Sequence, residues 1–583
     1  MTDHHTTTLP RFRWRTNATD NASVAAIATR FHLPLPVAGI LGGRGLTNPD
    51  DIECFLDPCL KRLADPFEFP GMERAAARIW QALEAHEPMV IFGDLDADGV
   101  TASALLADAI RRLGGAVSVF LPDRMTEGYG LTPVSVARCL RENPAKLLIT
   151  VDCGITSVAE IALFRKAGLD VVITDHHMSA ARLPDACAIV NPRVAASAGA
   201  EHLCGAGVAF KLVHALLKMG RQKNHAPSAA YDVREWLDAV AVATVADVVP
   251  LLGENRILVT SGLAVLSRRP RLGLQALKQR AGLHGTLTSH HLAFVLGPRI
   301  NAAGRMRTAW PALHLLHATD ADAAASLAVE LEGLNAERRT VEAKIVETAL
   351  AQLHETPPQG AVVVAGEGWH PGAIGIVAAR LTELWHLPTA VISLNPDGSG
   401  RGSVRGVRGD DVVALLNQCA GRLAGFGGHP RAAGFTLKSG ALDDFKNQFS
   451  AAAIAQRGER DTSVELLIDG WLQHAEFGTD VWKAMQRLEP FGEGHARPRW
   501  AMRGVRLAGR PTPVGATGDH LKMAFTVGNR TVKAIWFKQG HLAEIITASG
   551  PELDVVFEFH MNTFNGESSL EMSVVDIRAA SAN

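Results

Sequence analysis

Between residues 88 and 190 the sequence alternates short apolar runs with amphipathic stretches, and this alternation constrains the fold more than any other feature. The apolar runs are "MVIFG", "AVSVFLP", "KLLITVD", "LDVVITD" and "ACAIVNP", with helical patterns such as "TASALLADAIRRLG" and "SVAEIALFRKAG" between several of them. Continuous apolar runs are typical of strands buried on both faces. Strands that alternate with helices predict a doubly wound, mainly parallel sheet, whose ligands bind beyond the carboxyl ends of the strands.

Acidic residues and histidines follow several of these runs. They are Asp94, Asp96 and Asp98 after the first run, Asp152 after the third, Asp175, His176 and His177 after the fourth, and Asp247 after the later run "AVATVA". Because alternate residues of an extended chain share a face, the carboxylates of Asp94, Asp96 and Asp98 would crowd together unless a cation lay between them. Carboxylates with an imidazole favour Mn²⁺ or Mg²⁺. A pair of such ions can activate water and stabilise charge on a phosphoryl group.

The rest of the sequence predicts further domains. It is mostly helical up to about residue 320, and a polar stretch over 321–355, with Gly333 as its one glycine and no proline, predicts a single long helix. A second α/β pattern follows, and short β-rich runs from about residue 463 predict a small barrel or sandwich. We therefore expect a division into residues 1–45, 46–320, 321–357, 358–458 and 459–583, of which the first is an extension and the third is the connecting helix.

Composition limits the classes of protein that fit. A chain of 583 residues is too long for one core. Its formal net charge of -2 gives no overall attraction for a polyanion, so nucleic-acid binding would need a local basic groove. The seven cysteines include no C-x-x-C pair, the amino-terminal stretch has no apolar core of a signal peptide, and no uncharged apolar run is long enough to span a membrane. We expect a soluble, cytoplasmic protein with no membrane association.

The order of the acidic motifs resembles a known family. "GDLDADGVTAS", "TVDCGI", "TDHH" and "VADVVPL" are similar to the four phosphoesterase motifs of the DHH superfamily. "LPDRMTEGYGL" and "GPRINAAGRM" resemble its branch of bacterial single-strand-specific exonucleases, and the similarity extends from about residue 45 over nearly the whole chain. The resemblance implies an α/β multidomain fold: a DHH domain with a doubly wound sheet, a long helix, a DHH-associated α/β domain, and a C-terminal OB-fold β-barrel.

The resemblance also implies a metal centre with two divalent cations, Mn²⁺ or Mg²⁺. The implied ligands are Asp94, Asp96, Asp152, His176 and Asp247, with Asp152 bridging the ions. His177 would contact the scissile phosphate, with Asp98 and Asp175 as supporting members of the catalytic set. Many relatives have a histidine where this sequence has Phe92. We therefore expect one metal to be held more weakly, or its shell to be completed by water, and the substitution Phe92→His to tighten metal binding.

Substrate-binding residues are implied in both α/β domains. Ser403 and Arg405 would hold a 5′ phosphate together with Arg124, and Tyr129 would stack on a base. Gly428 and His429 belong to a "GGH" signature of the DHH-associated domain. Arg299, Asn301 and Arg305 would line the path between the two domains. In the C-terminal unit the available aromatic residues are Trp500, Trp536, Phe537 and Phe564, and packing in the core is an equal alternative for each of them. The available charges are Lys522, Arg530 and Lys533.

These features predict a 5′ to 3′ exonuclease that hydrolyses single-stranded DNA to 5′-mononucleotides in repair and recombination. A monomer is expected, and the resemblance suggests a single-strand-binding protein and a helicase as partners. One alternative is a phosphodiesterase for short oligoribonucleotides or cyclic dinucleotides; an extended chain with a barrel favours longer polymers. The other is a non-catalytic single-strand-binding scaffold, which five intact candidate ligands oppose.

Overall fold

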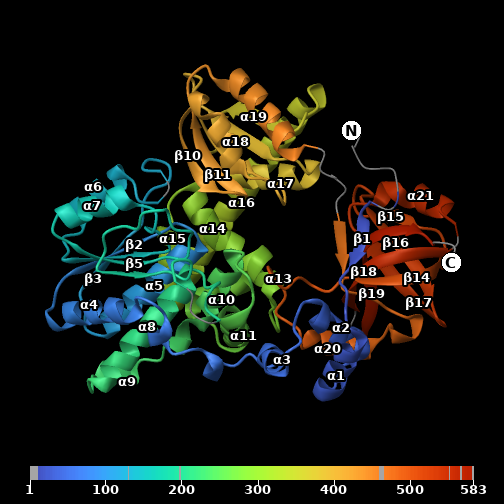
Figure 1. The fold of residues 1–583 in the computed structure, drawn as a ribbon, viewed down its shortest axis with the longest axis horizontal. Helices are drawn as coiled ribbons and strands as arrows, with labels where there is room; N and C mark the ends of the chain where they lie inside the picture. Colours follow the sequence, from blue (N-terminus) through green and yellow to red (C-terminus); the bar gives the residue numbers. More distant parts are fainter. Residues whose placement is uncertain are drawn as a thin grey trace. The chain divides into compact units, whose positions relative to one another are not determined.

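The computed structural model describes residues 9, 11–128, 130–195, 199–458, 465–550, 552–564 and 567–580 (Figure 1). The chain forms two compact units. One consists of Leu63–Arg460, and the other combines the N-terminal residues up to Arg62 with the residues from Asp461 onward. The N-terminal extension was expected over residues 1–45, and the N-terminal part of the smaller unit reaches Arg62.

The larger unit contains the predicted parallel sheet. Its five strands lie in the order β3-β2-β4-β5-β6, and every neighbouring pair is parallel, which confirms the doubly wound prediction. The strands are β2 (Met89–Gly93), β3 (Val117–Phe120), β4 (Leu147–Val151), β5 (Asp170–Thr174) and β6 (Ala188–Val190). The side chains of β2 and β4 are fully buried, as expected for a sheet covered on both faces.

Helices cover the two faces of this sheet (Figure 1). On one face lie α4 (Met72–Glu84), α5 (Ala97–Arg112) and α8 (Gly205–Gln222), which contact one another or the sheet. On the other face α6 (Pro133–Glu142) and α7 (Val158–Lys166) pack together and share an apolar cluster with Val90, Phe92 and Ile173. This double covering leaves the carboxyl ends of the strands as the edge where polar residues gather.

The segment after the sheet is helical, as predicted. Its helices are α9 (Ala226–Ala230), α10 (Leu237–Ala246), α11 (Gly253–Arg268), α12 (Leu272–Arg280), α13 (Ser289–His291), a π-helix (Leu292–Leu296), α14 (Gly297–Met306) and α15 (Trp310–His317). The stretch predicted as one long helix is α16 (Ala321–Glu355), with Asp320 as its N-cap. It packs on α12, α14 and α15, and also on β7 and α17 of the next domain, so it joins the two α/β parts.

The second α/β part is a mixed sheet in the order β10-β11-β9-β8-β7. Its strands are β7 (Val362–Glu367), β8 (Thr389–Leu394), β9 (Gly400–Arg405), β10 (Leu423–His429) and β11 (Ala432–Leu437), of which only β7 and β8 pair in parallel among the described residues. Its helices are α17 (Ile374–Trp385), α18 (Val412–Gln418) and α19 (Leu442–Arg457). One apolar cluster joins α17 and β7 to Ile345, Ala349 and Leu353 of α16.

The smaller unit is built around a seven-stranded sheet. Its strands are β13 (Gly470–Trp471), β14 (Trp500–Leu507), β15 (Thr512–Val514), β16 (His520–Val527), β17 (Arg530–Trp536), β18 (Glu552–Phe564) and β19 (Glu567–Ala579). Because β14 pairs with both β18 and β16, the pairings among β14, β18, β19, β17 and β16 close into a ring. This closure agrees with the predicted small barrel.

The N-terminal segment packs on this barrel. Strand β1 (Arg13–Thr16) pairs with β12 (Glu465–Ile468), and α2 (Leu35–Gly43) contacts β13 and α20 (Thr479–Gln486). The remaining helices of this unit are α1 (Asn21–Phe31), α3 (Pro49–Leu56) and α21 (Ala543–Ala548). The Asp576 carboxylate accepts hydrogen bonds from the backbone N–H of Arg11 and Phe12 and from the Trp14 indole, which fixes β1 in place.

Over the described residues, no helix taken singly has the length and apolar composition needed to cross a membrane; α1 and α2 meet that test only as a pair, bent by 118°.

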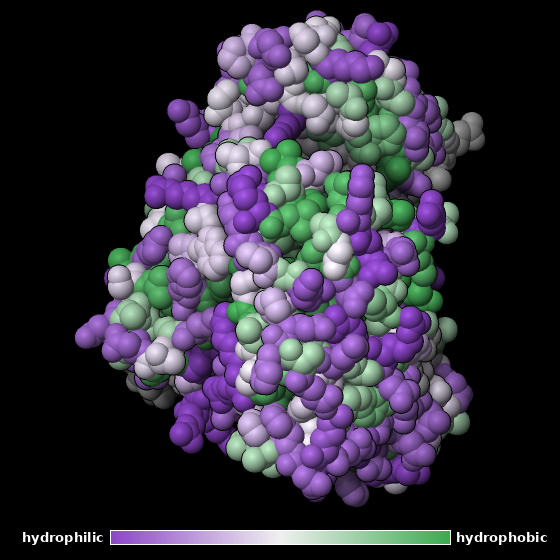
Figure 2. Space-filling view, turned by 90° about the vertical axis from the view of Figure 1, so that its left-hand side faces the viewer, coloured by the Kyte–Doolittle hydropathy of each residue, from purple (hydrophilic) through white to green (hydrophobic). Residues whose placement is uncertain are grey.

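On the face drawn in Figure 2, hydrophilic residues surround a central group of hydrophobic ones, which is the ordinary mixture of a protein surface.

Candidate active site

The carboxyl ends of three neighbouring strands carry the acidic and histidine residues. Asp94 and Asp96 follow β2, Asp152 follows β4, and Asp175, His176 and His177 follow β5. Asp247 is the C-cap of α10, and Asp96 is the N-cap of α5, where its Oδ1 accepts from the backbone N–H of Asp98 and Gly99. Since parallel strands end at the same edge, residues far apart in the chain meet there.

His176 lies at the centre of this acidic cluster. Its Nε2 is 3.1 Å from Oδ1 of Asp152, 3.5 Å from Oδ2 of Asp247 and 3.7 Å from Oδ2 of Asp98. Three groups of possible ligand atoms, each within 4.8 Å of one another, are Asp152/His176/His177, Asp98/His176/Asp247 and Asp94/Asp96/Asp152. Asp152 and His176 each belong to two of these groups, so these two residues link the three groups into one cluster.

Burial and mutual repulsion disfavour the charged forms of the carboxylates in the cluster. Burial, followed by the charges of neighbouring aspartates, raises the pKa of Asp152 and of Asp247 well above the usual range. Burial and the Asp96 charge raise the pKa of Asp98 to about 6. Burial and the neighbouring His177 lower the pKa of His176 to about 3, so its imidazole is neutral and able to ligate a metal.

The donor set fits divalent cations. Oδ1 of Asp152, Nε2 of His176 and Oδ2 of Asp247 are buried and make no hydrogen bond within the described part of the chain. Buried polar atoms are normally satisfied, so three such atoms facing one another indicate missing positive charge. Oxygen ligands with one imidazole match the preference of Mn²⁺ and Mg²⁺. These residues would hold the metals, which would supply activation of water and stabilisation of phosphoryl charge.

A glycine and a strained backbone position Asp152. Asp152 has φ of 60°, in the left-handed region that non-glycine residues rarely adopt. A Cβ placed on Gly205, at the start of α8, would lie 2.6 Å from the Cβ of Asp152 and 2.8 Å from its Oδ1. The backbone N–H groups of Gly205 and Ala206 donate to the carboxylate of Asp98 at 2.6 and 2.8 Å. The amino end of α8 therefore supports both aspartates, and Asp98 acts mainly by linking α5 to α8.

Asp175 holds His177 in place. Its Oδ1 lies 2.8 Å from Nδ1 of His177 and accepts from the backbone N–H of His176 and His177, while its Oδ2 accepts from the N–H of Ile155. Burial alone would lower the pKa of His177, but the hydrogen bond and charge of Asp175 outweigh it and raise that pKa to about 9. His177 is therefore a cation at neutral pH.

The second α/β domain contributes directly to this edge. The ring of His429, at the end of β10, lies parallel to the ring of His177 with centroids 6.2 Å apart. Gly428 before it has φ of 147°, and a Cβ there would lie 2.4 Å from the carbonyl oxygen of Ala432. The "GGH" signature thus forms a tight strand end that brings an imidazole over the histidine of the acidic cluster.

A group of arginines lies between the two α/β domains. Arg405 donates to Oγ of Ser403 at 2.9 Å, and Gly375 of α17 packs beside both side chains. Burial and the charge of Arg124 lower the pKa of Arg405, and the same two causes lower the pKa of Arg305 to about 10. Arg124, Arg305 and Arg405 are therefore close enough to repel one another, as expected of a site for an anion.

Two of the residues expected along the substrate path have internal partners. Arg299 forms an ion pair with Glu332 of α16 at 2.6 Å, and Oδ1 of Asn301 accepts from the backbone N–H of Ala97 at 2.6 Å. Arg299 therefore joins α14 to the long helix, and Asn301 supports the start of α5 beside Asp96. Tyr129, expected to stack on a base, lies outside the described residues.

The expectation for Phe92 needs correction. Its side chain is fully buried, and its ring packs against Phe120 and Phe164 at centroid distances of 5.0 and 6.4 Å. It belongs to the apolar cluster between the sheet and the helices α6 and α7. A histidine in this orientation would be buried among apolar side chains, so the position is a core position and not a missing ligand.

The aromatic residues of the smaller unit separate into two kinds. Trp500 and Trp536 are buried in the barrel, whereas Phe537 is 52% exposed. Lys522, Arg530 and Lys533 are exposed, and the side chain of Phe564 lies outside the described residues. Core packing therefore accounts for the two tryptophans, and Phe537 is the one of these described aromatics that faces solvent.

Sequence reasoning missed Asn191 and Arg193, which follow β6. Asn191 is buried, donates from Nδ2 to the carbonyl oxygen of His177 at 3.0 Å, and accepts from the N–H of Arg193 at 2.7 Å. The available signal was that the apolar run "ACAIVNP" is the last strand of the same sheet, so polar residues after it reach the same edge.

The fold and this site define a metal-dependent phosphoesterase of the DHH superfamily. The model of the DHH family N-terminal domain matches residues 88–244, and that of the DHHA1 domain matches residues 358–455. The RecJ OB domain model matches residues 468–576.

The chain belongs to the RecJ family. It is 35% identical over 570 residues to the "Single-stranded-DNA-specific exonuclease RecJ" of Bacillus subtilis, covering 97% of this chain and 71% of that protein. It is 34% identical to the protein of the same name from Thermus thermophilus, covering 92% and 74%. The crystal structure of RecJ in complex with Mn²⁺ from Thermus thermophilus matches with a TM-score of 0.84 at 32% identity, over 98% of this chain and 80% of that chain. The Mg²⁺ complex from the same source matches with a TM-score of 0.78 at 30% identity, over 98% and 79%.

Proposed function

We propose that this protein is a 5′ to 3′ exonuclease that hydrolyses single-stranded DNA to 5′-mononucleotides with two divalent cations, Mn²⁺ or Mg²⁺. The observation that carries the proposal is the set of buried, mutually facing ligand atoms of Asp152, His176 and Asp247 in a chain of the RecJ family. Relatives are named for single-stranded DNA, and two RecJ structures contain Mn²⁺ or Mg²⁺.

In the reaction, water attacks the phosphorus of the first internucleotide linkage. The bond from that phosphorus to O3′ of the terminal nucleotide breaks, the water oxygen remains on phosphorus, and O3′ takes up a proton. The terminal 5′-mononucleotide leaves, and the shortened strand keeps a new 5′ phosphate. Asp94, Asp96, Asp152, His176 and Asp247 are the residues that would hold the metals.

His177 serves as a hydrogen-bond donor to the reacting phosphate. Asp175 keeps it protonated at neutral pH and fixes Nδ1, which leaves Nε2 for the substrate. A positioned cation stabilises the negative charge that develops on the phosphoryl oxygens. His429 lies parallel to the ring of His177 and closes the site from the second domain.

The arginine group between the domains is the proposed holder of the terminal 5′ phosphate. Ser403 supplies a hydroxyl beside Arg405, and Arg124 and Arg305 add positive charge. A pocket for a terminal phosphate accounts for polarity, because only a 5′ end places its first linkage at a fixed distance from the metals. Relief of arginine repulsion by a bound dianion would stabilise the complex.

The direct test uses a DNA strand of about 30 nucleotides, because a strand of this length would engage an extended single-strand track. The strand is labelled at either its 5′ or its 3′ end and is offered single-stranded or in a duplex. Each substrate is incubated with Mn²⁺ and, separately, with Mg²⁺. We expect degradation of the single strand from its 5′ end and loss of activity in Asp152→Ala, with Asp185→Ala, 87% exposed, as the matched aspartate control. Degradation from both ends at equal rates would contradict the polarity. Faster hydrolysis of a dinucleotide than of the long strand would favour the short-oligonucleotide alternative, and metal-independent binding without hydrolysis would favour a scaffold.

A second comparison tests the phosphate pocket. Single strands with a 5′ phosphate should be degraded faster than strands with a 5′ hydroxyl, and Arg405→Ala should abolish this preference. An equal preference in the variant would place the terminal phosphate elsewhere.

We propose that the closed strand ring of the smaller unit binds the single strand, with Phe537 and the nearby exposed Lys522 and Lys533 as contacts. A monomer, a cytoplasmic location, and a single-strand-binding protein and helicase as partners remain predictions from the family resemblance.

A further inference from the structure

We propose that Arg193 is a catalytic residue that donates to a non-bridging oxygen of the scissile phosphodiester, on the side of the site where His429 lies. The inference rests on the proposed exonuclease function and adds a substrate-contacting residue to it. Arg193 lies in the turn after β6, outside the acidic and histidine motifs of the sequence.

The turn is built into the site by a buried amide. Asn191 is 2% exposed and joins two segments: its Nδ2 donates to the carbonyl oxygen of His177, and its Oδ1 accepts from the N–H of Arg193. The backbone N–H of Asp175 also donates to the carbonyl oxygen of Val190. The backbone of Arg193 is therefore fixed to the segment that carries the catalytic histidine.

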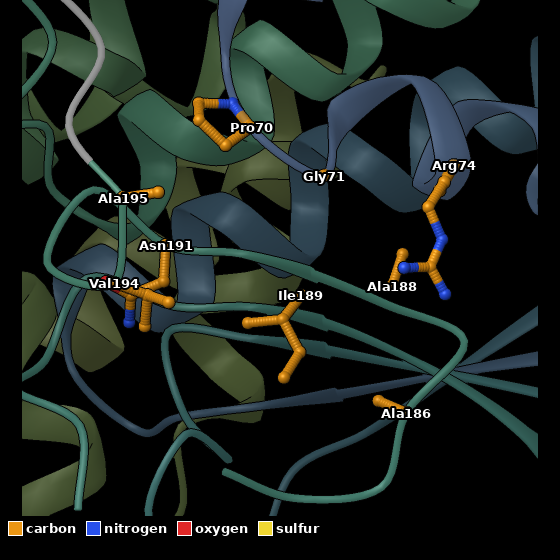
Figure 3. Close-up of a pocket in the computed structure, with 9 residues that line it drawn as sticks. All are labelled: Pro70, Gly71, Arg74, Ala186, Ala188, Ile189, Asn191, Val194 and Ala195. Atoms are coloured by element: carbon orange, nitrogen blue, oxygen red, sulfur yellow. The ribbon is translucent and has the colours of Figure 1, made fainter.

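The side chain of Arg193 is exposed and lacks a partner. Among the described residues its guanidinium forms no ion pair and no hydrogen bond. Figure 3 shows Asn191 and Val194 on this turn, where they line a cavity of about 260 Å³ together with Arg74 of α4 and Ile189 of β6. Arg74, on the far side of that cavity, donates a hydrogen bond to the carbonyl oxygen of Cys187. The guanidinium of Arg74 therefore has a partner within the protein, whereas that of Arg193 has none among the described residues.

The charge of Arg193 acts on two histidines of the candidate active site. After burial and the charge of His177, its positive charge is among the causes that lower the pKa of His429, and it also contributes to lowering the pKa of His176. The rings of His176, His177 and His429 lie in sequence, with centroid distances of 4.5 and 6.2 Å. The charge of Arg193 thus acts on His176 and His429, and the hydrogen bonds of Asn191 tie its backbone to His177.

The guanidinium of Arg193 has no partner among the described residues, and its turn is tied to the segment that carries His177, the cation of the histidine row. A phosphodiester bound between the metals and the histidine row would give both cations an anionic partner. The planar guanidinium can donate two parallel hydrogen bonds to phosphate oxygens, and these strengthen as negative charge develops during hydrolysis. Arginine suits this role better than lysine, whose ammonium is a point charge.

The test compares Arg193→Ala and Arg193→Lys with Arg141→Ala. Arg141 is an exposed arginine of α6 whose ion-pair partner among the described residues is its neighbour Glu142. With a 5′-labelled single strand, we expect the kcat of Arg193→Ala to fall about 100-fold and that of Arg193→Lys to fall about 10-fold. The KM should change less than threefold. Millimolar guanidinium should restore part of the kcat of Arg193→Ala and should not affect Arg193→Lys or the wild type.

Mn²⁺ binding to the same variants, measured by calorimetry without DNA, separates contact with substrate from support of the metal centre. We expect wild-type affinity in both. A kcat of Arg193→Ala within threefold of the wild type, a loss of Mn²⁺ affinity, or no rescue by guanidinium would each overturn the inference. If the wild-type protein itself fails to degrade the strand from its 5′ end, the proposed function fails instead, so the two failures are distinguishable.

Discussion

The substitution Asp175→Asn tests how the site keeps His177 protonated. Asn has nearly the same shape, but it carries no charge and only one oxygen. In the wild type, Oδ1 of Asp175 serves His177 and two backbone N–H groups, while Oδ2 serves the N–H of Ile155. The Asn amide oxygen can keep the contacts with His177 and the two backbone N–H groups. Its NH₂ group then faces the N–H of Ile155, which is also a donor and loses its acceptor. A modest loss of stability, about 1 to 3 kcal/mol, is therefore expected.

The structure gives the size of the electrostatic effect. The pKa of His177 is raised from 6.5 to about 9, which corresponds to about 3 kcal/mol at roughly 1.36 kcal/mol per pH unit. Because 34% of this side chain is exposed, solvent screening reduces the figure to about 2 kcal/mol. The stabilisation is complete below pH 6.5 and is lost as the pH rises through about 9. Without Asp175, burial still lowers the pKa of His177 and only the weaker charges of Asp94 and Asp98 raise it, so this pKa should fall well below its wild-type value of about 9.

Two measurements check this prediction. NMR of ¹³C-labelled histidines in the metal-free protein, assigned with His177→Asn, should show the fall in pKa. Hydrolysis of single-stranded DNA at neutral to mildly alkaline pH should be about 30-fold slower in Asp175→Asn, as about 2 kcal/mol implies, and the alkaline limb of the rate profile should move to lower pH. The control is Asp170→Asn at the start of the same strand, where Asp170 pairs with Arg78 and Arg165.

Asp170→Asn should change stability but leave the alkaline limb unmoved. The reasoning is refuted if Asp175→Asn keeps the wild-type limb and the wild-type pKa of His177, because burial would then be weaker than the structure indicates and Asp175 would not be the cause of the protonation.

Three further predictions concern the metal centre and the core beside it. Gly205→Ala places a Cβ 2.6 Å from the Cβ of Asp152, so the Mn²⁺ affinity measured by calorimetry should fall by about 10-fold or more. The control is Gly333→Ala in α16, where a Cβ meets nothing within 4 Å, and this variant should bind Mn²⁺ with wild-type affinity. Phe92→His should lower the free energy of unfolding by about 3 kcal/mol in urea titrations without tightening Mn²⁺ binding, and tighter binding would restore the missing-ligand interpretation. Because the pKa of Asp98 is raised to about 6, the folded state binds more protons than the unfolded state, and the metal-free protein should lose stability as the pH rises from about 4 to 7. Calorimetric Tm values should therefore rise more on addition of Mn²⁺ at about pH 7.5 than at about pH 5, and an equal rise would contradict the assignment.

Much of the fold could be predicted because it is encoded in local patterns. The apolar runs became strands β2 to β6, and the breaker-poor stretch became the single helix Ala321–Glu355. The convergence of Asp94, Asp152 and His176 also followed from the sequence, since parallel strands of one sheet place their carboxyl ends on one edge. Periodicity and chain direction are properties of neighbouring residues, so the sequence alone specifies them.

Only the tertiary structure decided which side chains face one another. It placed Phe92 in the core, gave Arg299 an ion-pair partner in α16, and set His429 parallel to His177 across two domains. It also tied Arg193 to the site through the buried amide of Asn191. These contacts join residues far apart in the chain, and they depend on strand order and helix packing. The sequence by itself therefore determined the class of chemistry, and packing determined which residues can take part in it.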